Sequence, residues 1–219
     1  MNKGLVSFTI KEFKEKVIQN CIILDTRNST GFTEGYIHGA ISIGLDGRFE
    51  EWAGNILPID QPILLVTEPG KEAETITRLA RVGFEKVEGY LKGGFDEWRS
   101  SGESIDLIID IEADELAMDL PFDDNLMVVD VRTPHEFAEG HVKDSTNIPL
   151  KDLTDLAQIA SLEEDQNIYV HSGEGYSSVI AASLLKRQGY HNLRNVLGGW
   201  NKIKEEENIP IEKSGEVLN

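Results

Sequence analysis

The chain has one cysteine, few basic residues and no long apolar run. Its single thiol, Cys21, cannot form a disulfide within the chain, which is typical of a reducing compartment. No apolar stretch approaches the ~18 residues that a membrane helix needs. No signal-peptide core precedes the charges that resume at Lys11. These absences predict a cytoplasmic location.

Basic residues are outnumbered, with 21 Lys and Arg against 39 Asp and Glu, so that the net charge is −18. A surface of this sign repels phosphate backbones and anionic lipid headgroups, and we expect neither nucleic acid nor membrane partners. No cysteine or second histidine stands at metal-ligand spacing from His38 or His141. The sequence therefore predicts no metal site and no cofactor.

What the chain does contain is an internal repeat at a constant offset of 105 residues. The matching pairs are Asp25 with Asp130, Arg27 with Arg132, segment 63–67 with 168–172, and the glycine pair 93–94 with 198–199. An offset held through separate segments indicates two copies of one domain. We expect domains at 1–102 and 103–219, each of ordinary domain size. Cys21 pairs with Leu126, so its position is interpreted as a packing site.

Each copy alternates short apolar runs with helix-like segments. Segments 22–25 and 63–67 are apolar runs that each end on one polar residue, and such runs are typical of buried strands in parallel sheets. Thr9, followed by Glu12, predicts a capped helix start. Strands and helices that alternate at this spacing predict an α/β fold, in which each domain has a parallel sheet flanked by helices on both faces. The residues after Asn208 are expected to form an irregular tail.

The loop after strand 168–171 is the first candidate for function. Ligands of such sheets bind outside the carboxyl ends of the strands. A glycine-containing loop that leads into a helix can direct several N–H groups at an anion or thiolate. A plain strand-to-helix turn fits this loop composition equally well. The candidate binding loop consists of Ser172, Gly173, Glu174, Gly175, Tyr176, Ser177 and Ser178. Ser178 is the expected N-cap of the helix that follows.

These features together resemble the rhodanese-like (sulfurtransferase) family over nearly the whole chain. The resemblance rests on the D-x-R motifs at Asp25 and Asp130, the strand–loop–helix unit and the closing G-G-W at 198–200. Segments 52–66 and 78–94 also resemble the tandem rhodanese tail of metallo-β-lactamase-fold persulfide dioxygenases. The zinc-binding H-x-H-x-D-H run of that dioxygenase is absent. The resemblance therefore does not imply dioxygenase activity in this chain.

The resemblance also implies where the catalytic residues should stand. Active members carry a C-x-x-G-x-R loop, in which the cysteine takes up sulfur as a persulfide. The motif maps the cysteine onto Ser172 and the arginine onto Ser177. In the first copy it maps them onto Thr67 and Glu72 within loop 67–72. Both copies keep the glycine and lack both reactive side chains, so we expect no catalytic residue at either nucleophile position.

The sequence gives less support to a catalytic role for His171 or for the D-x-R residues. His171 neighbours Ser172 on a strand and should point to the opposite face, which disfavours a serine hydrolase. The resemblance implies that the arginine of each D-x-R motif supports the loop through a salt bridge. These support residues are Asp25, Arg27, Asp130 and Arg132.

Two hypotheses follow. The first is a non-catalytic binding, docking or regulatory module in sulfur or persulfide metabolism. It would recognise a small anion, a persulfide, or a sulfur-metabolism enzyme such as a metallo-β-lactamase-fold dioxygenase. The second is a thiosulfate or persulfide sulfurtransferase whose residue 172 is cysteine in the native protein.

Overall fold

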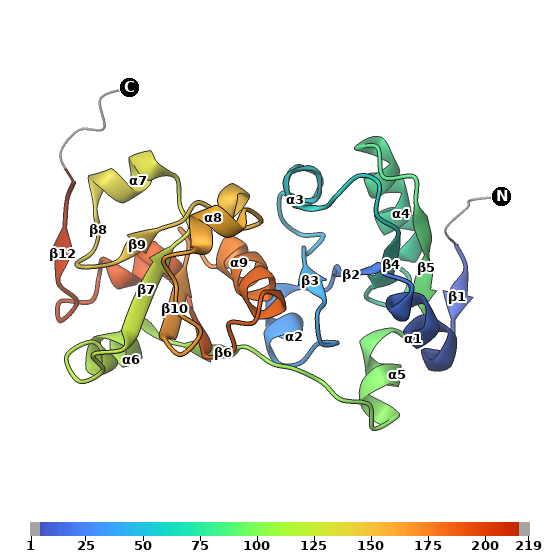
Figure 1. Ribbon diagram of the computed structural model, residues 1–219, viewed down its shortest axis with the longest axis horizontal. Helices are drawn as coiled ribbons and strands as arrows, with labels where there is room; N and C mark the ends of the chain where they lie inside the picture. Colours follow the sequence, from blue (N-terminus) through green and yellow to red (C-terminus); the bar gives the residue numbers. More distant parts are fainter. Residues whose placement is uncertain (1–4, 215–219) are drawn as a thin grey trace. The chain divides into compact units, whose positions relative to one another are not determined.

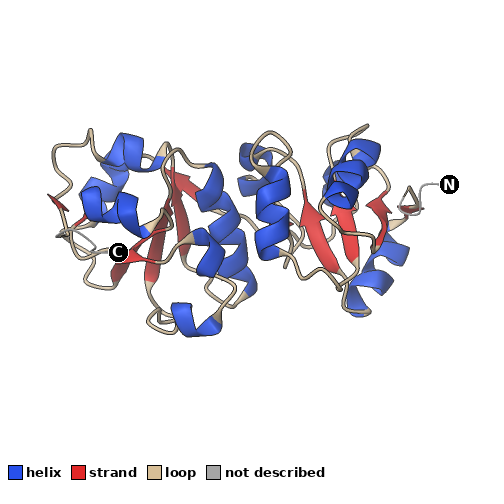
Figure 2. Ribbon diagram, turned by 90° about the horizontal axis from the view of Figure 1, so that it is seen from above, coloured by secondary structure: helices blue, strands red, loops and turns tan. Residues whose placement is uncertain are grey.

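The computed structural model describes residues 5–214 and divides the chain into two compact units, Met1–Leu107 and Ile108–Asn219. Each unit holds a parallel five-stranded sheet surrounded by helices, which confirms the predicted fold of two tandem α/β domains (Figure 1). Within each unit, helices lie on both sides of the strands (Figure 2). None of the helices in residues 5–214 combines the length and the apolar character needed to cross a bilayer.

The first sheet has the strand order β1-β5-β4-β2-β3. Its strands are β1 (Ser7–Phe8), β2 (Ile22–Asp25), β3 (Ile41–Ser42), β4 (Ile63–Val66) and β5 (Val87–Leu91). Its helices are α1 (Ile10–Ile18), α2 (Ser29–Thr33), α3 (Phe49–Ile56), α4 (Glu72–Arg81) and α5 (Gly94–Ser100). All residues of β2 and β4 are buried, as their continuous apolar sequences predict for strands inside a parallel sheet.

The second sheet repeats this arrangement with the order β6-β11-β10-β7-β9. Its strands are β6 (Ile109–Ile111), β7 (Leu126–Asp130), β9 (Thr146–Asn147), β10 (Asn167–His171) and β11 (Leu193–Val196). Its helices are α6 (Ala113–Asp119), α7 (Pro134–Glu139), the 3-10 helix η1 (Leu150–Asp152), α8 (Leu156–Ile159), α9 (Tyr176–Arg187) and α10 (Gly199–Ile203). The carboxyl ends of β7 and β10 are adjacent, with Asp130 opposite His171.

Local signals set several helix starts. The Thr9 hydroxyl accepts a hydrogen bond from the Glu12 N–H, and the Glu12 carboxylate accepts one from the Thr9 N–H at 2.8 Å. This reciprocal capping box confirms the predicted start of α1. Thr133 and Glu136 form the same box at α7.

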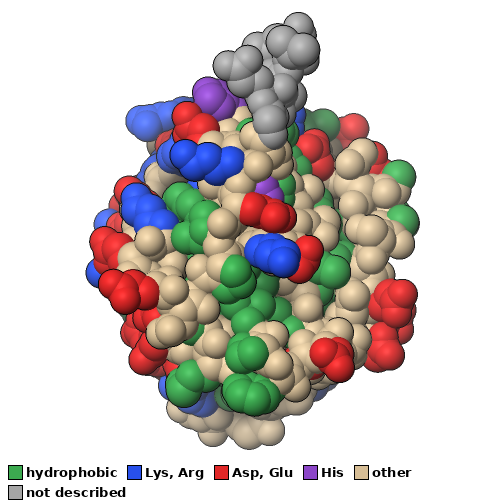
Figure 3. Space-filling model, turned by 90° about the vertical axis from the view of Figure 1, so that its left-hand side faces the viewer, with side chains coloured by type: hydrophobic (Ala, Val, Ile, Leu, Met, Phe, Trp, Pro, Cys, Tyr) green, Lys and Arg blue, Asp and Glu red, His purple; other side chains and the backbone are tan. Residues whose placement is uncertain are grey.

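On the face shown in Figure 3, acidic side chains are spread among basic ones, in keeping with the net charge of −18.

The border between the domains lies between Leu107 and Ile108, five residues beyond the expected division at 102/103. Residues 103–107 belong to the first unit because they bond to it. The Lys14 ammonium lies 2.8 Å from the Glu103 carboxylate. The Trp98 indole N–H donates to the carbonyl of Ser104 at 3.0 Å. Such contacts depend on tertiary structure, which composition near the border does not show.

The expected irregular tail after Asn208 is wrong in part. Residues Ile211–Glu212 form β12, which pairs antiparallel with β8 (His141–Val142). The Lys143 N–H also donates to the carbonyl of Pro210 at 2.8 Å. A two-residue strand carries too little sequence pattern to be recognised without its partner.

Candidate functional site

In the second domain the candidate loop begins at Ser172, directly after β10. Ser172 is buried, with 3% of its surface exposed. Its hydroxyl accepts a hydrogen bond from the Gly175 N–H at 3.0 Å. Gly175 has a φ of +108° and is the N-cap of α9, a conformation that favours glycine. The loop therefore directs one backbone N–H at the side-chain oxygen of the nucleophile position, where the sequence predicted several such groups.

The start of α10, at the glycine pair 198–199, holds the other side of this loop. The Trp200 N–H donates to the Ser172 carbonyl at 2.7 Å, and the Asn201 N–H donates to the Gly173 carbonyl at 3.2 Å. A Cβ atom added at Gly199 would lie 2.2 Å from the Ser172 carbonyl oxygen. Only glycine permits this close approach of α10 to the loop.

The rest of the loop leads into α9. Glu174 is exposed, whereas Tyr176 and Ser177 are half-buried. The prediction that Ser178 caps the helix is wrong, because α9 already begins at Tyr176. The left-handed Gly175 starts the helix early and leaves Ser178 inside its first turn.

Ser178 instead fastens α9 to the sheet. Its buried hydroxyl lies 2.6 Å from Oδ1 of Asn195 on β11. The Asn195 side-chain amide in turn donates to the Asp110 carboxylate on β6 at 2.7 Å. This chain of bonds fixes the helix start.

His171 is not placed to activate Ser172. The His171 ring is fully buried, with Nδ1 3.3 Å from the Ser172 carbonyl oxygen and Nε2 3.7 Å from the Asp130 carboxylate. No bond within residues 5–214 joins the His171 ring to the Ser172 hydroxyl. Burial lowers the pKa of His171, more than the nearby Asp130 raises it. The arrangement lacks the contact between base and nucleophile that serine catalysis needs.

The four expected support residues form two matching buried ion pairs. Nη2 of Arg27 lies 2.6 Å from the Asp25 carboxylate, and Nη2 of Arg132 lies 2.5 Å from the Asp130 carboxylate. The Arg27 and Arg132 guanidinium groups also donate to the carbonyls of Gly35 and Gly140. These bonds tie each sheet to the segment that follows its second strand.

Each arginine also stacks on the aromatic residue that follows the repeated glycine pair. Cζ of Arg27 lies 4.1 Å from the centre of the Phe95 ring, and Cζ of Arg132 lies 4.3 Å from the Trp200 ring. Because the Trp200 N–H binds the Ser172 carbonyl, Arg132 supports the second loop through Trp200.

The first domain differs at the equivalent loop. Thr67 follows β4 and has only 4% of its surface exposed. Within the described residues its hydroxyl forms no hydrogen bond, unlike that of Ser172. A cavity of about 180 Å³ lies beside it. The cavity wall includes Arg27, Thr67, Glu68, Phe95, Asp96 and Arg99.

Sequence reasoning identified Arg27, Thr67 and, as part of loop 67–72, Glu68, but it missed Asp96 and Arg99. Three separate segments bring these side chains to one cavity, and no motif links them. The available signal was the repeat, which aligns the start of α5 in the first domain with the start of α10 in the second.

The histidines singled out from the sequence serve structural contacts. Nδ1 of His141 lies 2.8 Å from the Phe137 carbonyl oxygen, and its ring stacks on the Phe137 ring. Nδ1 of His38 lies 3.6 Å from the Asp106 carboxylate. Within residues 5–214, no three His, Cys, Asp or Glu side chains are grouped so that they could hold a metal ion.

The two domains carry their loops and glycine pairs at matching positions. The sequence profile of the rhodanese-like domain matches residues 9–101 and 112–206. The chain therefore belongs to the rhodanese-like domain family and contains two tandem copies.

Three relatives each match less than half of the chain. A protein named sulfurtransferase from Allochromatium vinosum is 26% identical over 93 residues, which cover 42% of this chain and 85% of that protein. The adenylyltransferase and sulfurtransferase of Saccharomyces cerevisiae is 33% identical over 94 residues, which cover 39% of this chain and 21% of that protein. The crystal structure of a rhodanese-related protein from Thermoplasma volcanium is 31% identical, with a TM-score of 0.42, over 48% of this chain and 97% of that one.

Proposed function

We propose that the chain is a non-catalytic rhodanese-like protein that acts as a binding, docking or regulatory module in sulfur or persulfide metabolism. The observation that carries the proposal is the residue at each nucleophile position, Ser172 in one domain and Thr67 in the other. The mapped arginine positions hold Ser177 and Glu72. The scaffold of the family is thus retained without the side chains that its sulfur chemistry uses.

A hydroxyl cannot replace the missing thiol. The reactive species in cysteine chemistry is the thiolate, whose formation is favoured near neutral pH by a helix N-terminus and cationic neighbours. A serine hydroxyl does not ionise in this range and its oxygen does not carry sulfur as a stable persulfide. Ser172 also lacks an adjacent base, because the His171 ring contacts Asp130 and the Ser172 carbonyl instead.

Charge near the loops favours a docking role over capture of a free anion. Glu174 lies exposed within the second loop, and Glu72 starts α4 after the first. Both carboxylates disfavour small anions such as thiosulfate. The partner proposed is therefore a sulfur-metabolism enzyme, for example a metallo-β-lactamase-fold dioxygenase, with a small anion or persulfide as the weaker alternative. A cytoplasmic location is part of this proposal and rests on the composition.

A second candidate is a sulfurtransferase whose residue 172 is cysteine in the native protein. The favourable observation is the loop itself, where the Gly175 N–H points at the side-chain atom of residue 172. The curated relatives with sulfurtransferase names are consistent with this class.

The test is a thiosulfate:cyanide assay combined with mass spectrometry on the wild type, Ser172→Ala, Ser172→Cys and Ser172→Cys/Ser177→Arg. All are made with Cys21→Ser, so that any added sulfur lies at residue 172. We expect the wild type to match Ser172→Ala and to carry no persulfide. Wild-type turnover above Ser172→Ala would overturn the proposal. Appreciable activity of Ser172→Cys alone would support the second candidate. Activity only of the double variant Ser172→Cys/Ser177→Arg would support the first proposal, because the loop would then be competent and lack only the cysteine and the arginine.

A further inference from the structure

The cavity of the first domain has the features of a binding site separate from the second loop. It lies between the end of β4 and the start of α5, and Thr67 forms part of its wall. Thr67 is almost wholly buried, and its hydroxyl has no hydrogen-bond partner in the described residues. A buried hydroxyl at a cavity wall without a protein partner is available to a ligand.

Four charged side chains of both signs line this cavity without neutralising one another. Arg99 is the cation, and Glu34, Glu68 and Asp96 are the anions. Within the described residues none of the four forms an ion pair within 4.0 Å. Arg27, also in the wall, is already paired with Asp25.

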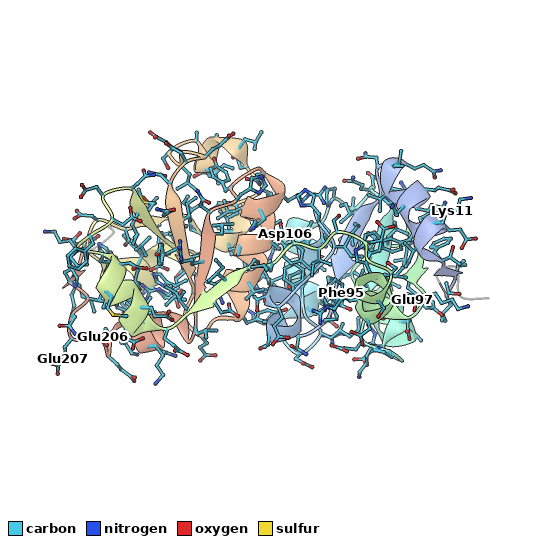
Figure 4. The ribbon with its side chains drawn as sticks, turned by 90° about the horizontal axis from the view of Figure 1, so that it is seen from below. Lys11, Phe95, Glu97, Asp106, Glu206 and Glu207 are labelled. Atoms are coloured by element: carbon cyan, nitrogen blue, oxygen red, sulfur yellow. The ribbon has the colours of Figure 1, made fainter. Side chains whose placement is uncertain are left out.

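Arg99 is held in place although its side chain is exposed. Its Cζ lies 4.9 Å from the centre of the Phe95 ring, which also lies on α5 near Glu97 (Figure 4). A Cβ atom added at Gly35 would come within 3.0 Å of Nη2 of Arg99. The glycine and the aromatic ring therefore fix the guanidinium beside the cavity while leaving its donors unpaired.

The second domain has no such arrangement at the matching positions. Lys204 stands where the first domain has Arg99, and its ammonium bonds to Oδ1 of Asn201 at 3.1 Å. Asn201 in turn stands where the first domain has Asp96. The Trp200 N–H binds the Ser172 carbonyl, whereas no backbone bond joins Phe95 to Thr67 in residues 5–214. The unpaired charges of both signs that Arg99 and Asp96 place beside Thr67 therefore have no counterpart at the matching positions of the second domain, Lys204 and Asn201.

We propose that this cavity binds a small zwitterion that carries both a carboxylate and an ammonium group, such as an α-amino acid. Arg99 would bind the carboxylate through charge-assisted hydrogen bonds. The carboxylates of Glu68 and Asp96 would bind the ammonium group, and the Thr67 hydroxyl would add a further polar contact. An inorganic anion meets three carboxylates here, and a simple cation meets Arg99, so that each is disfavoured on one side. The inference rests on the proposed binding function and assigns a ligand class to its first domain.

The experiment is a ligand-observed NMR screen of the full chain against the standard L-α-amino acids, followed by calorimetry on those that bind. For each, we compare the decarboxylated amine and the N-acetyl derivative, which lack one of the two charges, and thiosulfate as an anion. We expect the amino acid to bind at least tenfold more tightly than any of these three probes. Equal binding of the amine or of the N-acetyl derivative, stronger binding of thiosulfate, or no binding of any amino acid would overturn the proposal.

Three variants locate the site. Arg99→Gln and Asp96→Asn should each weaken amino-acid binding at least tenfold. Asp96→Asn gives position 96 the residue that the second domain has at the matching position, Asn201. Lys204→Gln, the matched change in the second domain, should leave the affinity unchanged. An affinity that survives Arg99→Gln, or that falls equally with Lys204→Gln, would contradict the assignment. Sulfur transfer by the wild type would overturn the proposed function without affecting this result, so the two failures are distinguishable.

Discussion

Replacing Arg132 by methionine tests the buried ion pair of the second domain. Methionine keeps an unbranched stem of similar size but removes the guanidinium, which now contacts the Asp130 carboxylate, the Gly140 carbonyl and the face of Trp200. Asp130 is fully buried, and its carboxylate would retain only the hydrogen bond from the backbone N–H of residue 132 and the His171 ring at 3.7 Å. Removal of one partner from a buried pair costs about 3–5 kcal/mol. A domain of this size is stable by only about 5–15 kcal/mol.

The expected loss corresponds to a fall of about 2 M in the urea midpoint of the second domain, at a slope of about 2 kcal/mol per M. Pulsed hydrogen exchange with mass spectrometry, recorded along a urea titration, reads the two domains separately. Peptides from β10 should lose protection at lower urea, whereas peptides from β4 should be unchanged. The matched control is Arg194→Met. Arg194 stacks on Tyr169 at 5.1 Å, outside any buried pair, and its loss should cost about 0.5–1 kcal/mol.

A double variant separates the loss of an attraction from the burial of an unpaired charge. With Asp130→Asn, the carboxylate that Arg132→Met leaves behind becomes a neutral amide. The double variant should therefore be at least about 1 kcal/mol more stable than Arg132→Met alone, a coupling within the usual range for contacting residues. The reasoning is refuted if the double variant is no more stable than the single one, or if Arg132→Met costs no more than Arg194→Met.

Two further predictions concern the surroundings of the second loop. Gly199→Ala should destabilise the second domain by about 1–3 kcal/mol from its left-handed backbone alone, with more from the clash with the Ser172 carbonyl; Gly173→Ala, which meets open space, is the control in urea unfolding. The lowered pKa of His171 means that the unfolded chain binds more protons, so stability should be full above the unfolded value of 6.5 and fall below it by up to about 1.4 kcal/mol per pH unit. His171→Val should reduce this dependence in unfolding measured from pH 7.5 to 5.5, and identical slopes would contradict the assignment.

The repeat made most of the fold predictable. A strand that is buried on both faces has a continuous apolar sequence, and this signal located β2 and β4. The reciprocal hydrogen bonds of a capping box, such as those of Thr9 and Glu12, involve a segment of only four residues, and the sequence predicts them as well. Interactions of this kind are local, or depend on burial alone, and a single sequence records them directly.

Features that depend on distant partners were not predictable in the same way. The strand β12 forms by antiparallel pairing with β8, in which Ile211 lies opposite Val142, far away in the sequence. The start of α9 depends on the left-handed conformation of Gly175, since the sequence permitted a start at Ser178 as well. The first-domain cavity needs side chains from three segments, and Arg99 gained significance only when the structure placed it beside Phe95 and Gly35.

The contacts that hold each domain together do not use the nucleophile positions, so the fold does not depend on which side chains stand there. The stabilising contacts common to both domains join Asp25 and Arg27 to Phe95 in one, and Asp130 and Arg132 to Trp200 in the other. None of them involves a side chain at a nucleophile position. A change at a nucleophile position removes at most one hydrogen bond, that of the Gly175 N–H to the Ser172 hydroxyl, which is worth about 0.5–1.5 kcal/mol. Loss of a buried arginine costs several times more. The side chain at a nucleophile position can therefore change at a small cost in stability, while the buried arginine that supports the same domain cannot.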